Sequence, residues 1–336
     1  MNTISTSAVF SRCRLRLISL LLCLTAQLFL LSTMCVAQAQ ATSPPQGQAP
    51  GQYTLRLEVN LVQLSVTVEG RKNSFVSGLG KDDFQVYEDG VAEHIEYFSH
   101  EDIPVTAGLV VDHSGSMRAK VPDVVAAALK FAQSSNPQDQ MFVVNFNEHV
   151  SFGLPGNTPF TDRTSQLQAA LSAGSAHGET ALYDAIGVAL DHLKQGNRDK
   201  KVLIVVSDGG DNASKLKLAQ VIAMAEKSNA LIYAIGIYAD EDEDKNPGVL
   251  NLLAKDTGGE AFFPKSLDEI SPVCERIAHD IRNQYSLAYT STNKKQDGAY
   301  RAIEVKASAP GRGRLSVRTR AGYLVPQSAG RQGDKP

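Results

Sequence analysis

Two apolar runs constrain the fold of this chain more than any other feature of its sequence. Val105–Val111 is almost wholly apolar, Val202–Val206 is wholly so, and each leads into a loop that carries an aspartate. Such runs are typical of strands that are buried on both faces of a parallel sheet. Segments with helical spacing alternate with strands from residue 104 to residue 264. The alternation predicts a doubly wound, mostly parallel α/β sheet with right-handed crossovers.

The periodicity also predicts where the individual elements of this α/β region lie. Strands are expected at Val105–Val111, Met141–Phe146, Val202–Val206, Ala230–Ile237 and Glu260–Phe263. Helices are expected at Val121–Ala132, Ala181–Leu193, Leu216–Ala225, Val249–Ala254 and Ser266–Gln284.

Segments with a period of two lie on both sides of the α/β region. Strands are expected at residues 57–68, 84–87 and 91–98 before it, and at 285–289, 303–307 and 315–319 after it. Glu88-Asp89-Gly90 supplies the turn of a hairpin between the second and third of these. A piece of two or three strands is marginally stable alone. We therefore expect the two flanks to share one small β domain; the alternative is that each packs separately on the α/β domain.

The first 39 residues have the pattern of a secretory signal. Arg12, Arg14 and Arg16 precede an apolar run at Leu17–Leu31, and Ala37-Gln38-Ala39 supplies the small residues of a cleavage site. The pattern predicts an exported protein (periplasmic, at the cell surface or secreted) without a membrane span in the mature chain. An uncleaved anchor, or a lipoprotein at Cys35, are the alternatives.

The whole chain is therefore expected to have six segments. They are a signal peptide at 1–39, a linker at 40–51, an N-terminal β segment at 52–100, the α/β domain at 101–282, a C-terminal β segment at 283–325 and a polar, disordered tail at 326–336. Loss of the signal changes the net charge from −3 to −6, which gives no general attraction for nucleic acid. It also leaves Cys274 as the only cysteine, and we expect a buried thiol there.

Oxygen-bearing side chains follow both apolar runs and precede one predicted helix. Open α/β sheets bind ligands beyond the carboxyl ends of their strands. Hard cations such as Mg²⁺ take oxygen ligands, use few carboxylates and keep several waters. The pattern predicts a site for one divalent cation, Mg²⁺ or else Mn²⁺ or Ca²⁺. Its candidate residues are Asp112, Ser114, Ser116, Thr180 and Asp208.

The loop Asp112-His113-Ser114-Gly115-Ser116, followed in order by Thr180 and Asp208, resembles the metal-ion-dependent adhesion site of von Willebrand factor A domains. That pattern is D-x-S-x-S, then a threonine, then an aspartate, each on a separate loop, and all five positions are filled here. The resemblance implies direct metal binding by both serines and direct or water-mediated binding by the threonine. The two aspartates would act mostly through water or by orienting the other ligands.

Two residues near this site depart from the family pattern or vary within it. Glu179 stands where the family commonly has glycine, and His113 fills the variable second position. Glu179 either brings a carboxylate near the ion or points to solvent at the start of a helix, where the helix dipole favours an acid. We prefer the second interpretation.

The flanks resemble a bacterial subgroup, the acidobacterial VWFA-related proteins. That resemblance implies an exported protein and no known chemistry. It rests on Gly78-Leu79, Asp82-Asp83-Phe84, Tyr87-Glu88-Asp89-Gly90, Ile95-Glu96-Tyr97-Phe98, Asn283-Gln284-Tyr285, Tyr300-Arg301-x-Ile303-x-Val305 and Arg320-Ala321-Gly322-Tyr323.

The family resemblance implies a non-enzymatic binding protein whose metal is completed by an Asp or Glu carboxylate of a protein partner. One alternative is a structural module whose ion only stabilises the loops. Another is a metal-dependent hydrolase, which needs a general base. Only His113 and His177 are near the loops in sequence, and a histidine on a surface loop is usually solvated. The acidic run at residues 240–244 lacks the spaced donors of a Ca²⁺ loop and is expected to be solvated.

Overall fold

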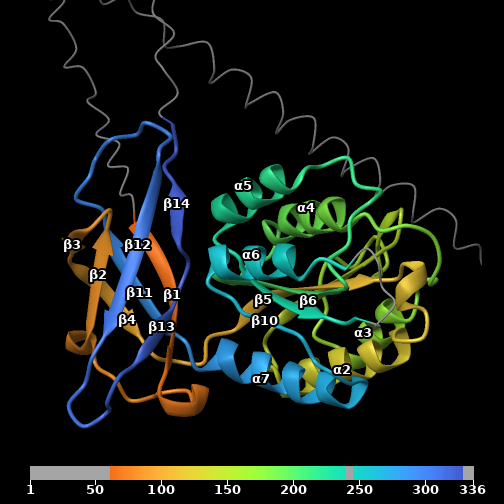
Figure 1. Cartoon of the computed structure of the whole chain (residues 1–336), viewed down its shortest axis with the longest axis horizontal. Coiled ribbons are helices and arrows are strands. Elements are labelled where there is room, and N and C mark those ends of the chain that lie inside the picture. The colour runs from red at the N-terminus through yellow and green to blue at the C-terminus, as the bar shows by residue number, and fades with distance from the viewer. Residues whose placement is uncertain (1–60, 239–244, 328–336) are drawn as a thin grey trace, which may run out of the picture. The chain divides into compact units, whose positions relative to one another are not determined.

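The computed structural model of the 336-residue chain describes residues 61–238 and 245–327 (Figure 1). The predicted signal peptide, the linker, the acidic run at 240–244 and residues 328–336 of the tail lie outside these ranges. Within the described ranges, no helix combines the length and the apolar character that crossing a membrane requires.

A six-stranded sheet forms the centre of the α/β domain, in the order β10-β9-β8-β5-β6-β7. Its strands are parallel except for β7, which pairs antiparallel with β6. In Figure 1, α4, α5 and α6 lie on one side of this sheet and α2 and α7 on the other. The fold is therefore the doubly wound, mostly parallel α/β class that the sequence predicts. The strands are β5 (Val105–Asp112), β6 (Gln140–Phe146), β7 (Val150–Phe152), β8 (Lys200–Ser207), β9 (Leu231–Gly236) and β10 (Ala261–Phe262); the helices are α2 (Val121–Ser134), α3 (Thr164–Leu171), α4 (Leu182–Leu193), α5 (Leu218–Ser228), α6 (Pro247–Thr257) and α7 (Ile270–Arg282).

The two apolar runs form the middle of this sheet. Every residue of β5 is buried, and β8 lies beside it in parallel register. A side chain at Gly108 would bring its Cβ within 2.5 Å of the Phe142 ring and 2.6 Å of Leu203. Glycine at this position lets large side chains of β6 and β8 pack over the centre of β5, which fixes the three strands together.

Strands from both ends of the chain form two four-stranded sheets with the orders β13-β1-β11-β4 and β14-β12-β2-β3. The two sheets enclose a second apolar core, which includes Val66, Phe84, Tyr285 and Ile303. The prediction of one shared β domain is therefore confirmed. Its strands are β1 (Leu61–Glu69), β2 (Phe84–Glu88), β3 (Val91–Glu93), β4 (Ile95–Ser99), β11 (Tyr285–Thr290), β12 (Tyr300–Ala307), β13 (Ser316–Arg318) and β14 (Gly322–Leu324).

Some elements differ from the prediction. The hairpin partner expected at Val91–Phe98 is two strands, because the chain leaves one sheet at His94: β3 pairs with β2, and β4 pairs with β11 in the other sheet. The sequence did not predict β7, α3 or β14. Strands β7 and β14 have three residues each, too few to show a period. Helix α4 begins at Leu182, so Thr180 lies in the loop before it.

A buried carboxylate on α7 connects the β domain to the α/β domain. Asp280 Oδ1 accepts a hydrogen bond from Thr67 Oγ1 of β1 at 2.8 Å. Its Oδ2 accepts bonds from Tyr233 Oη of β9 at 2.6 Å and from Arg318 Nη2 of β13 at 2.7 Å. A buried charge of this kind is retained only when it is paired and hydrogen-bonded. The Asp280 cluster, defined as these four residues, therefore fixes α7 against both domains.

We predict that Asp280→Ala lowers the free energy of unfolding by about 3 kcal/mol, because the buried hydroxyls of Thr67 and Tyr233 lose their acceptor and Arg318 keeps only the partly exposed Glu260 as an ion-pair partner. Urea unfolding followed by circular dichroism measures the loss. Asp268→Ala, at an exposed aspartate just before α7, is the control and should change stability by less than about 0.5 kcal/mol. Equal effects of the two substitutions would show that the cluster does not connect the domains as described.

Candidate metal centre

Hydrogen bonds of its own side chains hold the loop after β5 in a compact conformation. Asp112 is the last residue of β5 and is fully buried, and its Oδ1 accepts a hydrogen bond from Ser114 N at 2.8 Å. A short 3-10 helix, Gly115–Met117, then brings Ser116 Oγ to 3.1 Å from Ser114 Oγ. Ser114 is buried and Ser116 is exposed. The two serine hydroxyls therefore lie side by side at the carboxyl end of the sheet, one beneath the surface and one on it.

The loop after β8 joins this arrangement directly. Ser116 Oγ donates to Asp208 Oδ2 at 2.7 Å, while Asp208 Oδ1 accepts from Gly210 N at 3.0 Å. Ser207 Oγ donates to Asp112 Oδ2 at 2.6 Å. One chain of hydrogen bonds thus links four of the five predicted residues: Asp112, Ser114, Ser116 and Asp208.

The fifth residue, Thr180, lies on a third loop, which contacts both the loop after β5 and the loop after β8. Gly115 N donates to Gly178 O at 3.1 Å, which joins the Thr180 loop to the serine loop. Thr180 O accepts from Asn212 N at 3.0 Å and from Ala213 N at 3.1 Å, which joins it to the segment after β8. Thr180 is itself buried. Three loops that are far apart in sequence are therefore held together by their backbones.

The electrostatics of the centre favour a cation. The pKa of Asp112 is raised to about 6, mainly by burial; hydrogen bonds from Ser207 and Ser114 oppose the rise, and the negative charge of Asp208 adds to it. The carboxylates of Asp112 and Asp208 repel each other, and a positive ion between them would remove that repulsion. Within residues 61–238 and 245–327, no three His, Cys, Asp or Glu side chains gather in a way that suits a metal. The donors are mostly hydroxyls, which suits a hard cation better than Zn²⁺.

Two residues of the centre were not singled out from the sequence. Ser207 orients Asp112, and its Oγ also accepts a hydrogen bond from Gly209 N at 3.0 Å. Glu148 packs against Gly178, where an added Cβ would lie 1.7 Å from its Oε2. Ser207 was recognisable as the last residue of an apolar strand. Glu148 was not, because it lies in the turn before β7, a strand that the sequence did not reveal.

The structure corrects one interpretation and refines another. His113 is not on the solvated surface: it is buried beneath Gly174, and burial lowers its pKa. His177 is exposed, with its Nδ1 3.8 Å from Glu148 Oε1. Glu179 is exposed, as preferred, but it precedes α4 rather than occupying the first turn. Cys274 is a buried free thiol, and burial raises its pKa to about 12.

Comparison with known proteins identifies the α/β domain. The family model described as "von Willebrand factor type A domain" matches residues 108–275, half of the chain. This chain belongs to the von Willebrand factor type A (VWA) family. The match runs from the middle of β5 to α7, so the loops that carry Asp112, Thr180 and Asp208 all belong to the VWA domain.

Individual relatives are more distant. An uncharacterized protein of Borreliella burgdorferi is 25% identical over 174 residues, and the match spans 51% of this chain and 51% of that protein. The structure of a von Willebrand factor type A protein from Catenulispora acidiphila has a TM-score of 0.48 and 11% identity, covering 78% of this chain and 72% of that one. Conserved hypothetical protein BatB from Bacteroides thetaiotaomicron has a TM-score of 0.44 and 16% identity, covering 53% of this chain and 98% of that one.

We predict that Ser207→Ala destabilises the VWA domain by about 1–2 kcal/mol, because it leaves a buried oxygen of Asp112 without a donor. Urea unfolding at neutral pH measures the change. Ser172→Ala, at an exposed serine after α3, is the control and should be neutral. A neutral Ser207→Ala would mean that Asp112 is held in place without Ser207.

Proposed function

We propose that this chain is an exported VWA protein that binds a protein partner through a metal ion. Ser114, Ser116 and Thr180 would bind Mg²⁺ through their hydroxyls, with Asp112 and Asp208 orienting them or acting through water. The observation that supports this proposal is the chain of hydrogen bonds from Asp112 through both serines to Asp208. It gathers oxygen donors from separate loops at the carboxyl end of the sheet, where open α/β folds bind ligands.

The donor chemistry supports binding of an acidic group. Neutral hydroxyls leave most of the charge of a divalent cation uncompensated, and a carboxylate from another molecule can then complete its shell. Ser116 is exposed while Asp112 and Ser114 are buried beneath it. An ion held on Ser116 would therefore face solvent on one side, the side from which an Asp or Glu of a partner would approach.

The environment of the histidines supports a binding role over hydrolysis. His113 is buried beneath Gly174, so it is poorly placed to exchange protons with a substrate at the ion. His177 is exposed beside Glu148, three residues before Thr180 in the sequence. A stabilising ion with no partner is the remaining alternative, and the two experiments below separate it from binding.

The finer assignments belong to the same proposal. We propose export from the signal-like pattern at residues 1–39, and domain boundaries at 52–100, 101–282 and 283–325. The flanking motifs support membership of the acidobacterial VWFA-related subgroup, and several of them meet in the β domain. Glu88 Oε1, for example, accepts a hydrogen bond from Arg301 Nη1 at 2.9 Å, and Glu88 Oε2 accepts one from Tyr323 Oη at 3.0 Å.

Metal binding can be tested on the purified protein. Mg²⁺ should bind the wild-type protein and raise its melting temperature, and Ser116→Ala should weaken binding at least about tenfold because it removes a direct ligand. Isothermal titration calorimetry measures the affinity, and Mn²⁺ and Ca²⁺ titrations rank the ions. Ser175→Ala, at an exposed serine near the site, is the matched control. Equal affinities in both variants would place the ion elsewhere, for instance on the acidic run at 240–244.

Partner binding is tested separately, by capture on immobilised protein. Immobilised wild-type protein should retain a partner from the envelope fraction of the source organism with Mg²⁺ and release it when a chelator is added. Ser116→Ala should retain nothing specific, and Ser175→Ala should behave as wild type. If the same proteins are retained in every condition while Mg²⁺ still raises the melting temperature, the ion is structural and the binding proposal is wrong.

A further inference from the structure

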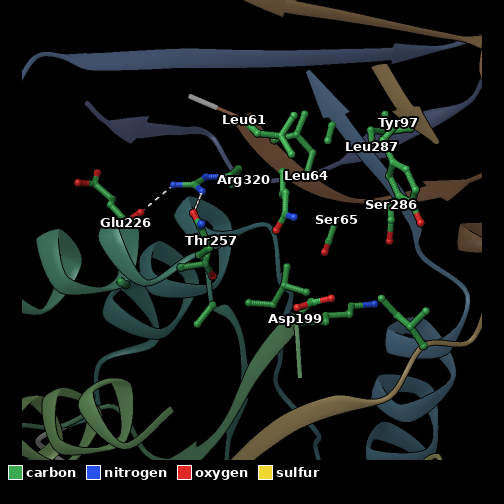
Figure 2. Close-up of a pocket in the computed structure, with 18 of the residues that line it drawn as sticks. Leu61, Leu64, Ser65, Tyr97, Asp199, Glu226, Thr257, Ser286, Leu287 and Arg320 are labelled. Carbon is green, nitrogen blue, oxygen red and sulfur yellow. Dashed lines mark hydrogen bonds between the residues drawn. The ribbon is translucent and has the colours of Figure 1, made fainter. Parts of the chain in front are cut away.

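A hollow of about 430 Å³ lies between the β domain and the VWA domain (Figure 2). One wall is the outer face of β1, β11 and β4. The other is the amino-terminal edge of the central sheet, where β8 and β9 begin, together with the ends of α5 and α6. Pockets of about 300–1,000 Å³ suit small molecules. The metal centre is at the opposite, carboxyl end of the same strands, so the hollow is a separate site.

Small side chains on the β domain create this space. Residues of β1 alternate, so Val62, Leu64 and Val66 are buried in the core of the β domain while Ser65 points the other way. Ser286 lies opposite Ser65 in the β1–β11 register. Two serines at neighbouring positions leave a gap that larger side chains would fill. The exposed Leu61 and Tyr97 line the same wall and add apolar surface.

The positive side chains of the hollow are already engaged by the protein. Arg320 donates from Nε to Gly322 O at 2.8 Å, from Nη2 to Glu226 O at 2.7 Å and from Nη1 to Asn229 Oδ1. Lys200 Nζ donates to Ile281 O. Since these donors are directed at protein oxygens, both cations are less available to an anion in the hollow than unpaired side chains would be.

By contrast, one acidic side chain and two hydroxyls of the hollow have no hydrogen-bond partner in the described part of the chain. Asp199 is exposed, and in the described part of the chain its carboxylate makes no hydrogen bond or ion pair. The nearby positive charge that it acts on is Lys201, whose Nζ donates to Gly196 O at 2.7 Å. The hydroxyls of Ser65 and Ser286 likewise donate to no residue in 61–238 or 245–327. Figure 2 shows both hydroxyls pointing into the hollow toward the side where Asp199 lies. Asp199 and the two hydroxyls are therefore polar groups of the lining without a hydrogen bond to any described residue, set among apolar walls. The lining also holds the carboxylates of Glu226 and Asp256 and the amide of Gln63, so its acids outnumber its two cations, Lys200 and Arg320.

We propose that this hollow is a binding site for a small amphipathic cation, an amine attached to an apolar body of about the size of an indole ring. The ammonium group pairs with Asp199, and the ring lies against Leu61, Tyr97 and Leu231. The two serine hydroxyls hydrogen-bond to polar atoms along the ligand. A charge-assisted hydrogen bond to Asp199 gives the amine its advantage over neutral or anionic molecules of the same shape.

Three indole compounds test the charge preference directly. Tryptamine is a cation, 3-ethylindole is neutral and indole-3-propionate is an anion, with similar apolar bodies. The chain contains no tryptophan, so indole fluorescence excited at the red edge of absorption reports the probe alone. We expect the full-length protein to bind tryptamine about tenfold more tightly than indole-3-propionate. No binding of any probe overturns the proposal, and so does equal or tighter binding of the anion.

Two pairs of variants locate the binding. Asp199→Asn should reduce tryptamine affinity to that of 3-ethylindole, while Asp123→Asn, at an exposed aspartate of α2, should leave the preference unchanged. Ser286→Leu fills the hollow and should abolish binding of all three probes, whereas Ser316→Leu on the exposed face of β13 should not. Tryptamine binding that survives Asp199→Asn unchanged overturns the proposal, even if Ser286→Leu fails to fold.

Discussion

The parallel register of β5 and β8 is the constraint on which the candidate metal centre depends. Val111 lies beside Val206, so the two strands end at the same level and Asp112 and Asp208 follow at neighbouring positions. Because both strands are buried on both faces, a register shift would expose apolar residues or bury polar ones, and the sheet resists it. The hydrogen bond from Ser207 to Asp112 then fixes one carboxylate in the orientation that the serine loop needs.

A second constraint holds the two domains together, and it comes from the order of the chain. Helix α7 ends at Arg282 and β11 begins at Tyr285, so the last helix of the VWA domain continues almost directly into a central strand of the β domain. The Asp280 cluster closes this junction with side chains from β1, β9 and β13. Since β1 and β13 come from opposite ends of the chain and β9 belongs to the VWA domain, Asp280 joins both ends of the β domain to the central sheet.

The sequence predicted what is encoded locally and missed what depends on tertiary contacts. The apolar runs and the helical periods located the central sheet. The three-loop motif predicted one site from Asp112, Ser114, Ser116, Thr180 and Asp208, and hydrogen bonds link all of these except Thr180. The change of sheet at His94 was invisible, because residues 91–98 alternate without a break and only pairing with β11 separates β3 from β4. His113 was misjudged because its burial comes from Gly174, sixty residues further along the chain. The contact between Glu148 and Gly178 escaped for the same reason.

The candidate metal centre and the hollow lie at the two ends of one strand, and this separation limits how they can influence each other. Asp199 precedes β8 and Asp208 follows it, and a strand of that length spans about 26 Å. This is well beyond the roughly 8–10 Å over which exposed charges interact in physiological salt. A charge bound in the hollow therefore has little direct electrostatic effect on the ion site. Any coupling must come from movement of the packed elements between them, and the Asp280 cluster opposes such movement by holding α7 to β1, β9 and β13.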